Sequence, residues 1–323
     1  MKAIVCIKYG PPEVLHLKEV PKATPKPNEI LIRNHAITVI AGDCEMRGFN
    51  FSYPLRLRLL MRLAVGLRGP RKTILGQELA GVVEEIGENV TLFREGDQVF
   101  AATGFGMGAY AEYTCVSEKG LVASKPTNMT FEEASTVPIG GLEALHFMRK
   151  ANLQSGQKIV INGAGGSIGI FAIQLAKYWG ADVTAVDIAR KFDMMRTLGA
   201  DYVIDYTEED FTESGEIYDV IFDIVGKATF SGCMRSLGGD GIYLLGNGWL
   251  SRTDKMTAER SNRQALGYSS DYQSKHLVYL KELIEAGTIR TFIERTYPLE
   301  EMVEAHRYVE TGQKIGNVVI TVE

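Results

Sequence analysis

The stretch from Gln157 to Asp187 constrains the fold more than any other part of the sequence: it reads QKIVINGAGGSIGIFAIQLAKYWGADVTAVD. It opens with a short apolar run, Lys158 to Asn162, of the kind found in buried strands. Glycines follow, and from Ile168 onward the apolar residues recur at the spacing of one helix face. A second strand-like run, DVTAVD, ends the stretch. This order predicts a strand, a glycine-rich turn, a helix and a second strand, which are the opening elements of a parallel sheet.

The glycine-rich turn is a variant of the dinucleotide-binding fingerprint, with Ala164, Gly166 and Gly169 in its three glycine places. Gly166 would let the backbone approach a pyrophosphate, and Gly169 would allow the helix to pack closely on the strand. The free N–H groups at the start of the helix attract an anion. Asp187 ends the second strand 18 residues after Gly169, where a carboxylate can accept hydrogen bonds from a ribose. A tight turn without a ligand is the alternative, but the strand, helix and terminal acid together favour a nucleotide.

Further short apolar runs follow at residues 202–206, 218–226 and 241–247. Polar segments of helix-compatible composition separate them. Such alternation predicts a doubly wound parallel sheet, and the ligand of such a sheet lies at the carboxyl ends of its strands.

The remaining sequence predicts a second domain. Residues 1–122 read mostly as strands broken by glycine and proline, and a helix from about Ser274 to Ala286 precedes a closing strand, NVVITV. We therefore expect an α/β protein in which a nucleotide-binding domain, residues 123–267, is inserted into a mostly-β domain made of residues 1–122 and 268–323.

Composition excludes several classes of protein. The chain has 323 residues, 45% hydrophobic and 23% charged, which suits an ordinary globular protein of two domains. The net charge of −5 argues against general nucleic-acid binding. No apolar run approaches the roughly 20 residues that span a bilayer and no secretory signal pattern opens the chain, so we expect a cytoplasmic location. The four cysteines lie far apart, which predicts neither a disulfide framework nor a cysteine zinc site.

Motifs along nearly the whole chain resemble the medium-chain dehydrogenase/reductase superfamily, and most closely its zinc-free quinone oxidoreductase branch. These motifs occur in the family order and are MKAIV, PNEILIRNHA, VTLFREGDQVFA, GAYAEY, FEEASTVPIGGLEALHF, NGAGGSIG, LGADYVIDYTEEDF and IGNVVITV. The resemblance implies a Rossmann domain inserted into a GroES-like catalytic domain, and a cofactor that is NAD(H) or NADP(H). It also implies a homodimer joined through the edge strand of the Rossmann sheet, which we expect at residues 241–247.

The positions that would hold a catalytic zinc differ from those of zinc-dependent relatives. Such relatives carry a cysteine about where Ile40 stands, a histidine at Gln77 and a third ligand near Ile139 or Gly140. A neutral glutamine amide is a poor zinc ligand beside thiolate and imidazole. We therefore expect no zinc.

Without a Lewis acid, simple alcohol oxidation loses several kcal/mol of transition-state stabilisation. Quinones and α,β-unsaturated carbonyl compounds spread the incoming charge over their own π-system, and the resemblance implies small hydrophobic substrates of this kind. Two alternatives remain open: an enoyl-thioester reductase, and a nucleotide-binding sensor with little turnover.

Two tyrosines, Tyr53 and Tyr110, are candidates for donating the proton that completes the reduction, because the resemblance places both beside the cleft. Solvent is the other source, and a tyrosine of this kind can also be a packing residue with a wet hydroxyl. Asp43 matches an aspartate on the nicotinamide side of the family's site. It could orient the cofactor, but a turn or helix cap is the interpretation we prefer.

The residues expected to bind the cofactor come from the fingerprint, from the acid that ends its second strand and from family positions. They are Asp43, Gly163, Ala164, Gly166, Ser167, Ile168, Gly169, Asp187, Arg190, Lys191, Tyr206, Val225, Gly246, Asn247 and Asn317.

The choice between the two nicotinamides rests on opposing charges. Asp187 would bind the ribose hydroxyls and repel a 2′-phosphate, whereas Arg190, Lys191 and Tyr206 would attract it. The lysine and the tyrosine fall at spacings similar to those with which NADPH-dependent quinone reductases grip that phosphate. A carboxylate within hydrogen-bonding reach should outweigh flexible solvated cations, so we expect a small preference for NADH.

Residues 55–72 lie within YPLRLRLLMRLAVGLRGPRK and carry only basic charges, since no acidic residue occurs between Glu45 and Glu78. The Leu and Arg pattern predicts an amphipathic helix or an exposed hairpin, which could associate weakly with an anionic membrane surface. We favour a cap over the substrate entrance, with Arg outward and with Leu59, Leu60 and Met61 inward as an apolar wall.

Overall fold

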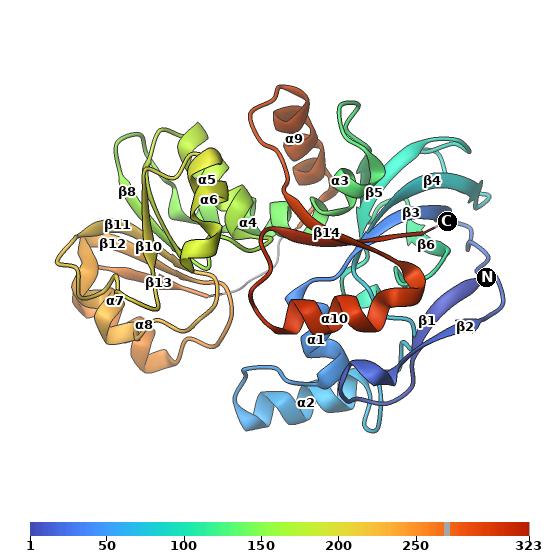
Figure 1. Ribbon diagram of the computed structural model, residues 1–323, viewed down its shortest axis with the longest axis horizontal. Helices are drawn as coiled ribbons and strands as arrows, with labels where there is room; N and C mark the ends of the chain where they lie inside the picture. Colours follow the sequence, from blue (N-terminus) through green and yellow to red (C-terminus); the bar gives the residue numbers. More distant parts are fainter. Residues whose placement is uncertain (268–271, 323) are drawn as a thin grey trace. The chain divides into compact units, whose positions relative to one another are not determined.

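The structure, a computed structural model, describes residues 1–267 and 272–322 (Figure 1). These residues form two compact units, the first made of residues 1–142, 272–287 and 291–322 and the second of residues 143–267 and 288–290. The expected α/β class is confirmed, with a parallel sheet in one unit and a mostly-β fold in the other. The domain boundaries expected near residues 122 and 267 stay a prediction.

The second unit is built on a parallel sheet, as the fingerprint stretch predicts. Within the described residues its strand order is β10-β9-β8-β11-β12-β13, and every neighbouring pair is parallel. The strands are β8 (Lys158–Asn162), β9 (Asp182–Asp187), β10 (Tyr202–Asp205), β11 (Tyr218–Asp223), β12 (Leu237–Leu245) and β13 (Gln264–Leu266). The strand order reverses beside β8, which is where a sheet of this type binds its ligand.

Helices connect these strands in chain order. They are α5 (Gly169–Tyr178), α6 (Phe192–Thr197), α7 (Phe230–Ser236) and α8 (Arg252–Arg260), with a 3-10 turn at Ala189–Lys191. Figure 1 shows α5 and α6 on one side of the sheet and α7 and α8 on the other. This division follows from right-handed crossovers that leave β8 in opposite directions along the sheet. Helix α5 is nearly apolar and its residues from Gly169 to Ala176 are buried, so it lies at the centre of the unit.

The first unit is mostly β. Its main sheet has the order β14-β15-β3-β4-β5-β7, with β6 paired to β3, and β1 and β2 form a separate antiparallel pair. The strands are β1 (Lys2–Cys6), β2 (Leu15–Glu19), β3 (Glu29–Thr38), β4 (Glu78–Ile86), β5 (Gln98–Ala102), β6 (Tyr113–Ser117), β7 (Leu121–Ser124), β14 (Ile293–Pro298) and β15 (Asn317–Thr321). The closing strand, expected from NVVITV, is β15.

Helices complete the unit. They are α1 (Ala41–Gly48), α2 (Leu55–Val65), α3 (Phe131–Ser135), α9 (Ser274–Glu285) and α10 (Met302–Glu310), with 3-10 turns at Pro12–Val14, Gly104–Gly106 and Leu299–Glu301. Helix α4 (Pro138–Ala151) begins in the first unit and continues into the second. The core brings together buried residues of β3, β4, β15, α1 and α10, and this packing fixes the polar groups described below.

One expectation about the sheet is wrong. Residues 241–247 were expected to form its edge, but β12 is an interior strand because β13 pairs with it on the far side through Ile242 and Gln264. The expectation failed because β13 spans only three residues, too few to show as a strand in the sequence. Among the described residues, no helix is both long enough and apolar enough to cross a membrane.

Candidate functional site

The carboxyl ends of the parallel strands form a candidate site in the second unit. Asn162 ends β8, Asp187 ends β9 and Asp223 ends β11, and strand register places Asn162 beside Val186 and Asp223. Because the strands are parallel, their polar last residues meet at one edge of the sheet. The structure therefore brings the fingerprint turn and the expected ribose acid together, as the sequence predicts.

The turn between β8 and α5 is shaped by glycines with different tasks. Gly163 has a φ of 90°, a left-handed conformation that favours glycine, and donates its N–H to the Val186 carbonyl. A Cβ on Gly169 would lie 2.4 Å from the Ala164 carbonyl oxygen, so this glycine permits the close approach of α5 and β8. A Cβ on Gly166 would meet only the Gly163 oxygen, at 3.6 Å. The space beside Gly166 is thus open, which suits the expected approach of a pyrophosphate.

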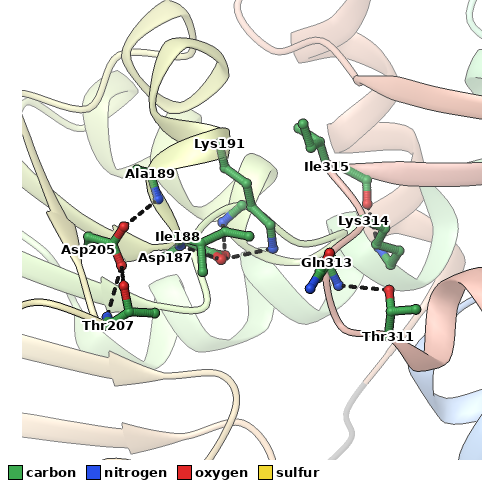
Figure 2. Close-up of polar contacts among 12 residues, drawn as sticks. Asp187, Ile188, Ala189, Lys191, Asp205, Thr207, Thr311, Gln313, Lys314 and Ile315 are labelled. Atoms are coloured by element: carbon green, nitrogen blue, oxygen red, sulfur yellow. Dashed lines mark hydrogen bonds and ion pairs between the residues drawn. The ribbon is translucent and has the colours of Figure 1, made fainter.

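Asp187 is held by three donors of its own unit (Figure 2). Its carboxylate accepts hydrogen bonds from the N–H groups of Gly165 and Ile188, both at 2.9 Å. Lys191 Nζ lies 2.8 Å from the same carboxylate, and both side chains are almost fully buried. A Cβ on Gly165 would collide with Lys191 Cδ at 2.3 Å, so a glycine is needed here to make room for the ion pair. Sequence analysis did not anticipate Gly165, although its place in the fingerprint was a usable signal.

The other residues expected to choose between the nicotinamides surround this pair. Arg190 is exposed in the turn after β9, and Tyr206 is exposed after β10. Asp205 orders the segment between them, since it accepts hydrogen bonds from the Ala189 N–H and from the N–H and hydroxyl of Thr207 (Figure 2). Lys191, by contrast, is buried on Asp187.

Asp223, which sequence analysis missed, orders the loop after β11. It accepts hydrogen bonds from the Asn162 amide and from the N–H groups of Gly226 and Ala228, and Tyr243 donates to it. Two of the expected cofactor residues lie in the surrounding turns. Val225 lies against the turn at Gly163, because a Cβ on Gly163 would be only 2.8 Å from the Val225 side chain. Gly246 donates its N–H to the Asp223 carbonyl. The remaining expected residues of this unit, Ser167, Ile168 and Asn247, also lie in these turns.

A separate cluster of candidate functional residues lies in the first unit, around Asp43 on α1. Asp43 accepts hydrogen bonds from the Ile40 N–H at 3.2 Å and from Gln77 Nε2 at 3.2 Å. The first bond caps α1, which confirms the preferred structural interpretation of Asp43. Burial raises the pKa of Asp43 to about 6. The Asp43 carboxylate therefore orients the Gln77 amide. Its pKa lies close to neutral pH.

A series of buried hydrogen bonds connects Asp43 to Tyr110, His306 and Cys44. Tyr110 is fully buried and hydrogen-bonds Asp43, and its hydroxyl lies 3.1 Å from His306 Nε2. His306 Nδ1 faces the Cys44 thiol at 3.3 Å and the Arg47 guanidinium at 3.4 Å. Since arginine can only donate, Nδ1 is the acceptor and Nε2 carries the proton towards Tyr110. The chain therefore runs in one direction, from Cys44 through His306 and Tyr110 to Asp43.

Burial fixes the charge states in this chain. Burial and the Arg47 cation lower the pKa of His306 to about 3, so the ring is neutral at physiological pH. Burial also raises the pKa of Cys44 and of Tyr110 above their ordinary values. Arg47 is itself buried and pairs with Glu310. His306 and Arg47 were missed in the sequence, since no local motif links α1 to the distant α10.

Glu78, the first residue of β4, holds the start of α4. One carboxylate oxygen accepts a hydrogen bond from the Ile139 N–H at 2.5 Å, and the other accepts one from the Thr38 hydroxyl at 2.5 Å. Gly140 contributes a further backbone hydrogen bond. Burial raises the pKa of Glu78 to about 7. The helix start that would carry a third zinc ligand in zinc-dependent relatives is thus engaged by a carboxylate.

The chemistry of these residues does not suit zinc. Ile40 offers no donor, the Gln77 amide is bonded to Asp43, and the backbone N–H groups of Ile139 and Gly140 face Glu78. Among residues 1–267 and 272–322, no three His, Cys, Asp or Glu side chains cluster in a metal-binding arrangement.

Two other expected residues have different surroundings. Tyr53 is half-buried and its ring stacks on Phe51, with the centroids 6.1 Å apart. Asn317 is buried in β15, where its amide nitrogen donates to the Thr291 hydroxyl and the Phe292 carbonyl. Its amide oxygen accepts no hydrogen bond from any described residue. That oxygen is a buried acceptor of the kind a bound ligand can satisfy.

The leucines of residues 55–72 do not pack on their own unit as a group. Residues 55–65 do form a helix, α2, but Leu59 and Leu60 are 58% and 63% exposed, and only Met61 is half-buried. The half-buried apolar residues of α2 are instead Leu57, Met61 and Val65. They are spaced four residues apart and therefore lie on one face of the helix. The cap over a substrate entrance, with its apolar wall, stays a prediction.

Comparisons with known proteins show which family the chain is similar to. The model of the alcohol dehydrogenase GroES-like domain matches residues 26–127, and that of the zinc-binding dehydrogenase family matches residues 198–320. The mouse (Mus musculus) protein "NAD(P)H oxidoreductase RTN4IP1, mitochondrial" is 33% identical, covering 100% of this chain and 89% of its own length. The tomato (Solanum lycopersicum) "2-methylene-furan-3-one reductase" is 32% identical over 99% of this chain and 79% of its own. A solved structure of the quinone oxidoreductase from Coxiella burnetii is 29% identical and superposes with a TM-score of 0.88, covering 100% of this chain and 99% of its own.

Proposed function

Since the chain belongs to the medium-chain dehydrogenase/reductase superfamily, in its quinone oxidoreductase-like part, we propose that it transfers hydride from NADH or NADPH to quinones or α,β-unsaturated carbonyl compounds without using zinc. The similarity to a named quinone oxidoreductase and a named furanone reductase supports the substrate class. The observation that carries the proposal is the Gln77 amide, held by Asp43 where zinc-dependent relatives carry a ligand histidine.

The fingerprint turn fits a nicotinamide cofactor. The open space at Gly166 and the start of α5 would receive the pyrophosphate, and the turns that carry Val225, Gly246 and Asn247 would line the same edge of the sheet. The buried, unpartnered amide oxygen of Asn317 would accept a hydrogen bond from the cofactor. The cofactor supplies the hydride when bound.

Gln77 replaces a metal by a hydrogen-bond donor in this proposal. One N–H of its amide is used by Asp43, and this bond fixes the direction of the other N–H. We place that second N–H on the carbonyl oxygen of the substrate, where negative charge develops as hydride arrives at carbon. A neutral donor suffices because the substrate's own π-system spreads the charge, whereas an alkoxide would need stronger stabilisation.

The proton that completes the reduction comes from solvent in this account. Tyr110 is fully buried, its hydroxyl is engaged by His306 and Asp43, and its pKa is raised, all of which make it a weak acid at this place. We assign Tyr110 a positioning role, because it holds Asp43 and through it Gln77. Tyr53 stays a candidate donor.

The charges that set the cofactor preference partly cancel. Lys191 neutralises Asp187, so the carboxylate repels a 2′-phosphate less than a lone acid would. Its remaining acceptor sites still favour ribose hydroxyls, and exposed Arg190 and Tyr206 favour a phosphate. We retain a small preference for NADH as part of the proposal. The cytoplasmic location and the homodimer also remain proposals, and the mouse relative is named mitochondrial.

A substrate panel tests the proposed function. Protein dialysed against a chelator is supplied with NADH or NADPH and with a quinone, an enone or an enoyl thioester. In the reverse direction, it is supplied with NAD+ or NADP+ and a primary alcohol. We expect oxidation of the nicotinamide with the quinone or the enone, unchanged by chelation. Preferred use of the thioester would favour the reductase alternative, and binding of nucleotide without turnover on any acceptor would favour a sensor. Loss of activity on chelation, restored by zinc, would contradict the metal-free site.

The variant Gln77→Leu tests the carrying observation. Removing a donor aimed at developing negative charge should lower kcat by about 100-fold with a small change in nucleotide affinity. Gln98→Leu, a change at the exposed first residue of β5, is the control. Full activity of Gln77→Leu would remove the basis of the proposal.

A further inference from the structure

Helix α2 carries two apolar stripes that face in nearly opposite directions, since successive residues of a helix are rotated by about 100°. The half-buried residues of the inner stripe, spaced four apart, are Leu57, Met61 and Val65. The exposed residues of the outer stripe, with the same spacing, are Leu55, Leu59 and Leu63. Their exposed fractions are 70%, 58% and 56%, and Leu60 and Leu67 beside them are each 63% exposed.

The helix is fixed to its unit, so the outer stripe has a defined direction. The Arg62 guanidinium lies over the rings of Tyr9 and Phe49, at 4.4 and 4.5 Å from their centroids. The Tyr9 hydroxyl donates to the Gly66 carbonyl at 3.0 Å, and Arg71 donates to the Leu63 carbonyl at 2.9 Å. With the inner stripe half-buried and the C-terminal end of the helix tied, the outer leucines are held outward as a continuous apolar surface.

Positive charge surrounds this surface. The exposed cations on α2 and the segment after it are Arg56, Arg58, Arg68, Arg71 and Lys72. No acidic residue occurs between Glu45 and Glu78, although the whole chain has a net charge of −5. The local charge is therefore opposite to that of the molecule. Exposed leucines flanked by arginines form the two-part surface of a helix that lies in a membrane interface.

We infer that residues 55–72, the leucine–arginine segment, dock the protein on an anionic membrane surface. The outer leucines enter the boundary between headgroups and acyl chains, and the surrounding Arg and Lys side chains bind lipid phosphates and carboxylates. An acidic headgroup layer complements both features at once, since it offers negative charge above an apolar interior. The inference is independent of the proposed reaction, because it uses none of the residues that the proposed reaction uses.

Vesicle sedimentation of the full chain tests this docking. The probes are vesicles of phosphatidylcholine alone and of phosphatidylcholine mixed with phosphatidylserine. We expect binding to the mixed vesicles only, weakened by added salt because exposed charges are screened. Equal binding to both kinds of vesicle, or to neither, would overturn the inference.

Two sets of variants separate the apolar and the charged contributions. The first replaces Leu55, Leu59 and Leu63 by Ser, and its control is Leu17→Ser with Leu92→Ser, which changes exposed leucines elsewhere. We expect at least tenfold weaker partition for the first variant and no change for the control. Equal loss in both would mean that exposed leucine at any place suffices, which contradicts a dedicated segment.

The second set is Arg56→Gln with Arg58→Gln, and its control is Arg94→Gln, a change at an exposed arginine outside the segment. Neutralising both arginines should reduce binding and also its dependence on salt, whereas the control should retain both. Thermal unfolding of every variant confirms that the fold is intact. If the wild type self-associates and the serine variant becomes monomeric while vesicles are not bound, a second copy of the chain covers the stripe and the membrane is excluded.

Discussion

Asp187 and Lys191, which form a buried ion pair, are the residues that we expect to set the choice between NADH and NADPH. In isolation, the carboxylate would select NADH and the lysine NADPH. The structure joins the two at 2.8 Å, so each cancels much of the other's field. Substituting one partner should therefore shift the cofactor preference towards the nicotinamide that the remaining partner favours.

Opposite shifts are expected from the two substitutions. Asp187→Ser should move the ratio of catalytic efficiencies, kcat/KM, towards NADPH by about tenfold, equivalent to roughly 1.4 kcal/mol. Lys191→Met should move it towards NADH, and should cost about 3 kcal/mol of stability because a buried carboxylate loses its cation. The double variant should return near the wild-type ratio. Shifts of the same sign in both single variants would show that the pair does not face the 2′ position.

Tyr110 offers a second test at this scale. Tyr110→Phe removes one donor to Asp43 and leaves His306 Nε2 without its partner. A positioning role predicts a loss of a few-fold in kcat and about 1–3 kcal/mol of lost stability. It also predicts that the acid limb of the pH profile moves to higher pH, because the hydrogen bond that lowers the pKa of Asp43 is lost. A proton donor would instead contribute about 100-fold or more. Tyr113→Phe, half-buried on β6, is the control, and steady-state kinetics over pH distinguish the roles.

Sequence reasoning found residues whose role is local and missed those whose partners are distant. Asp187 was predicted because it ends a strand directly after the fingerprint. His306 was not, because its contacts with Cys44 and Tyr110 join residues separated by 262 and 196 positions. Nothing around His306 in the sequence distinguishes it from a packing residue of a helix. Glu78 was missed for the same reason, since its partner Ile139 lies 61 positions away.

In the turn between β8 and α5, we expect one glycine to be needed for folding and another for nucleotide binding. A Cβ at Gly169 would collide with the backbone of Ala164, whereas one at Gly166 would enter open space. Gly169→Ala should therefore force α5 away from β8 and lower both the melting temperature and nucleotide affinity. Gly166→Ala should keep the melting temperature and weaken nucleotide binding alone.

Thermal unfolding with and without nucleotide measures both effects. Wild-type protein at about 100 times the dissociation constant should gain roughly 2.7 kcal/mol of stability from the ligand. Gly166→Ala should lose most of this gain at the same nucleotide concentration. Unchanged nucleotide stabilisation of Gly166→Ala would mean that the pyrophosphate lies elsewhere.

The start of α4 depends on Glu78 and so on pH. The pKa of Glu78 is about 7 in the folded protein against an ordinary value of 4.5. A raised folded pKa gives stability that is complete below the unfolded pKa and is lost as pH rises through the folded pKa. Glu78→Gln keeps an oxygen for Ile139 and an N–H for Thr38 but does not titrate. From about pH 4.5 to about pH 8 the variant should therefore gain on the order of 3 kcal/mol relative to wild type.

Denaturant unfolding at several pH values provides this comparison. Glu85→Gln, a change at an exposed carboxylate on the same strand, serves as the control. The contribution of neutral His306 is common to wild type and variant and cancels in the difference. A difference between wild type and Glu78→Gln that does not change with pH would mean that Glu78 is ionised throughout.

For helix α2, the sequence predicted the helix but not which of its faces is buried. The sequence predicted a helix or hairpin with leucines inward, and the helix is present. Leucine is abundant on every side of this helix, so its periodicity cannot choose the buried face. The choice is made by Tyr9 and Phe49, which seat Arg62 and so direct Leu57, Met61 and Val65 inward.

At the scale of the whole molecule, the proposed reaction needs both compact units of the chain. The second supplies the fingerprint turn and the Asp187–Lys191 pair, and the first supplies Gln77 with its buried support. The sequence predicted the class of both units, because their motifs follow the order of the family. It did not predict the supports, which arise only when distant elements pack.

The most direct test of the central claim is isotopic. Each stereoisomer of a nicotinamide cofactor deuterated at its reactive carbon is supplied to the chelator-dialysed protein with an enone, and the product is examined by mass spectrometry and nuclear magnetic resonance. Our account predicts that one stereoisomer delivers a single deuterium to the β-carbon of the enone, and that the α-carbon takes its hydrogen from solvent. A product without cofactor deuterium, or a reaction that requires added zinc, would contradict direct metal-free hydride transfer.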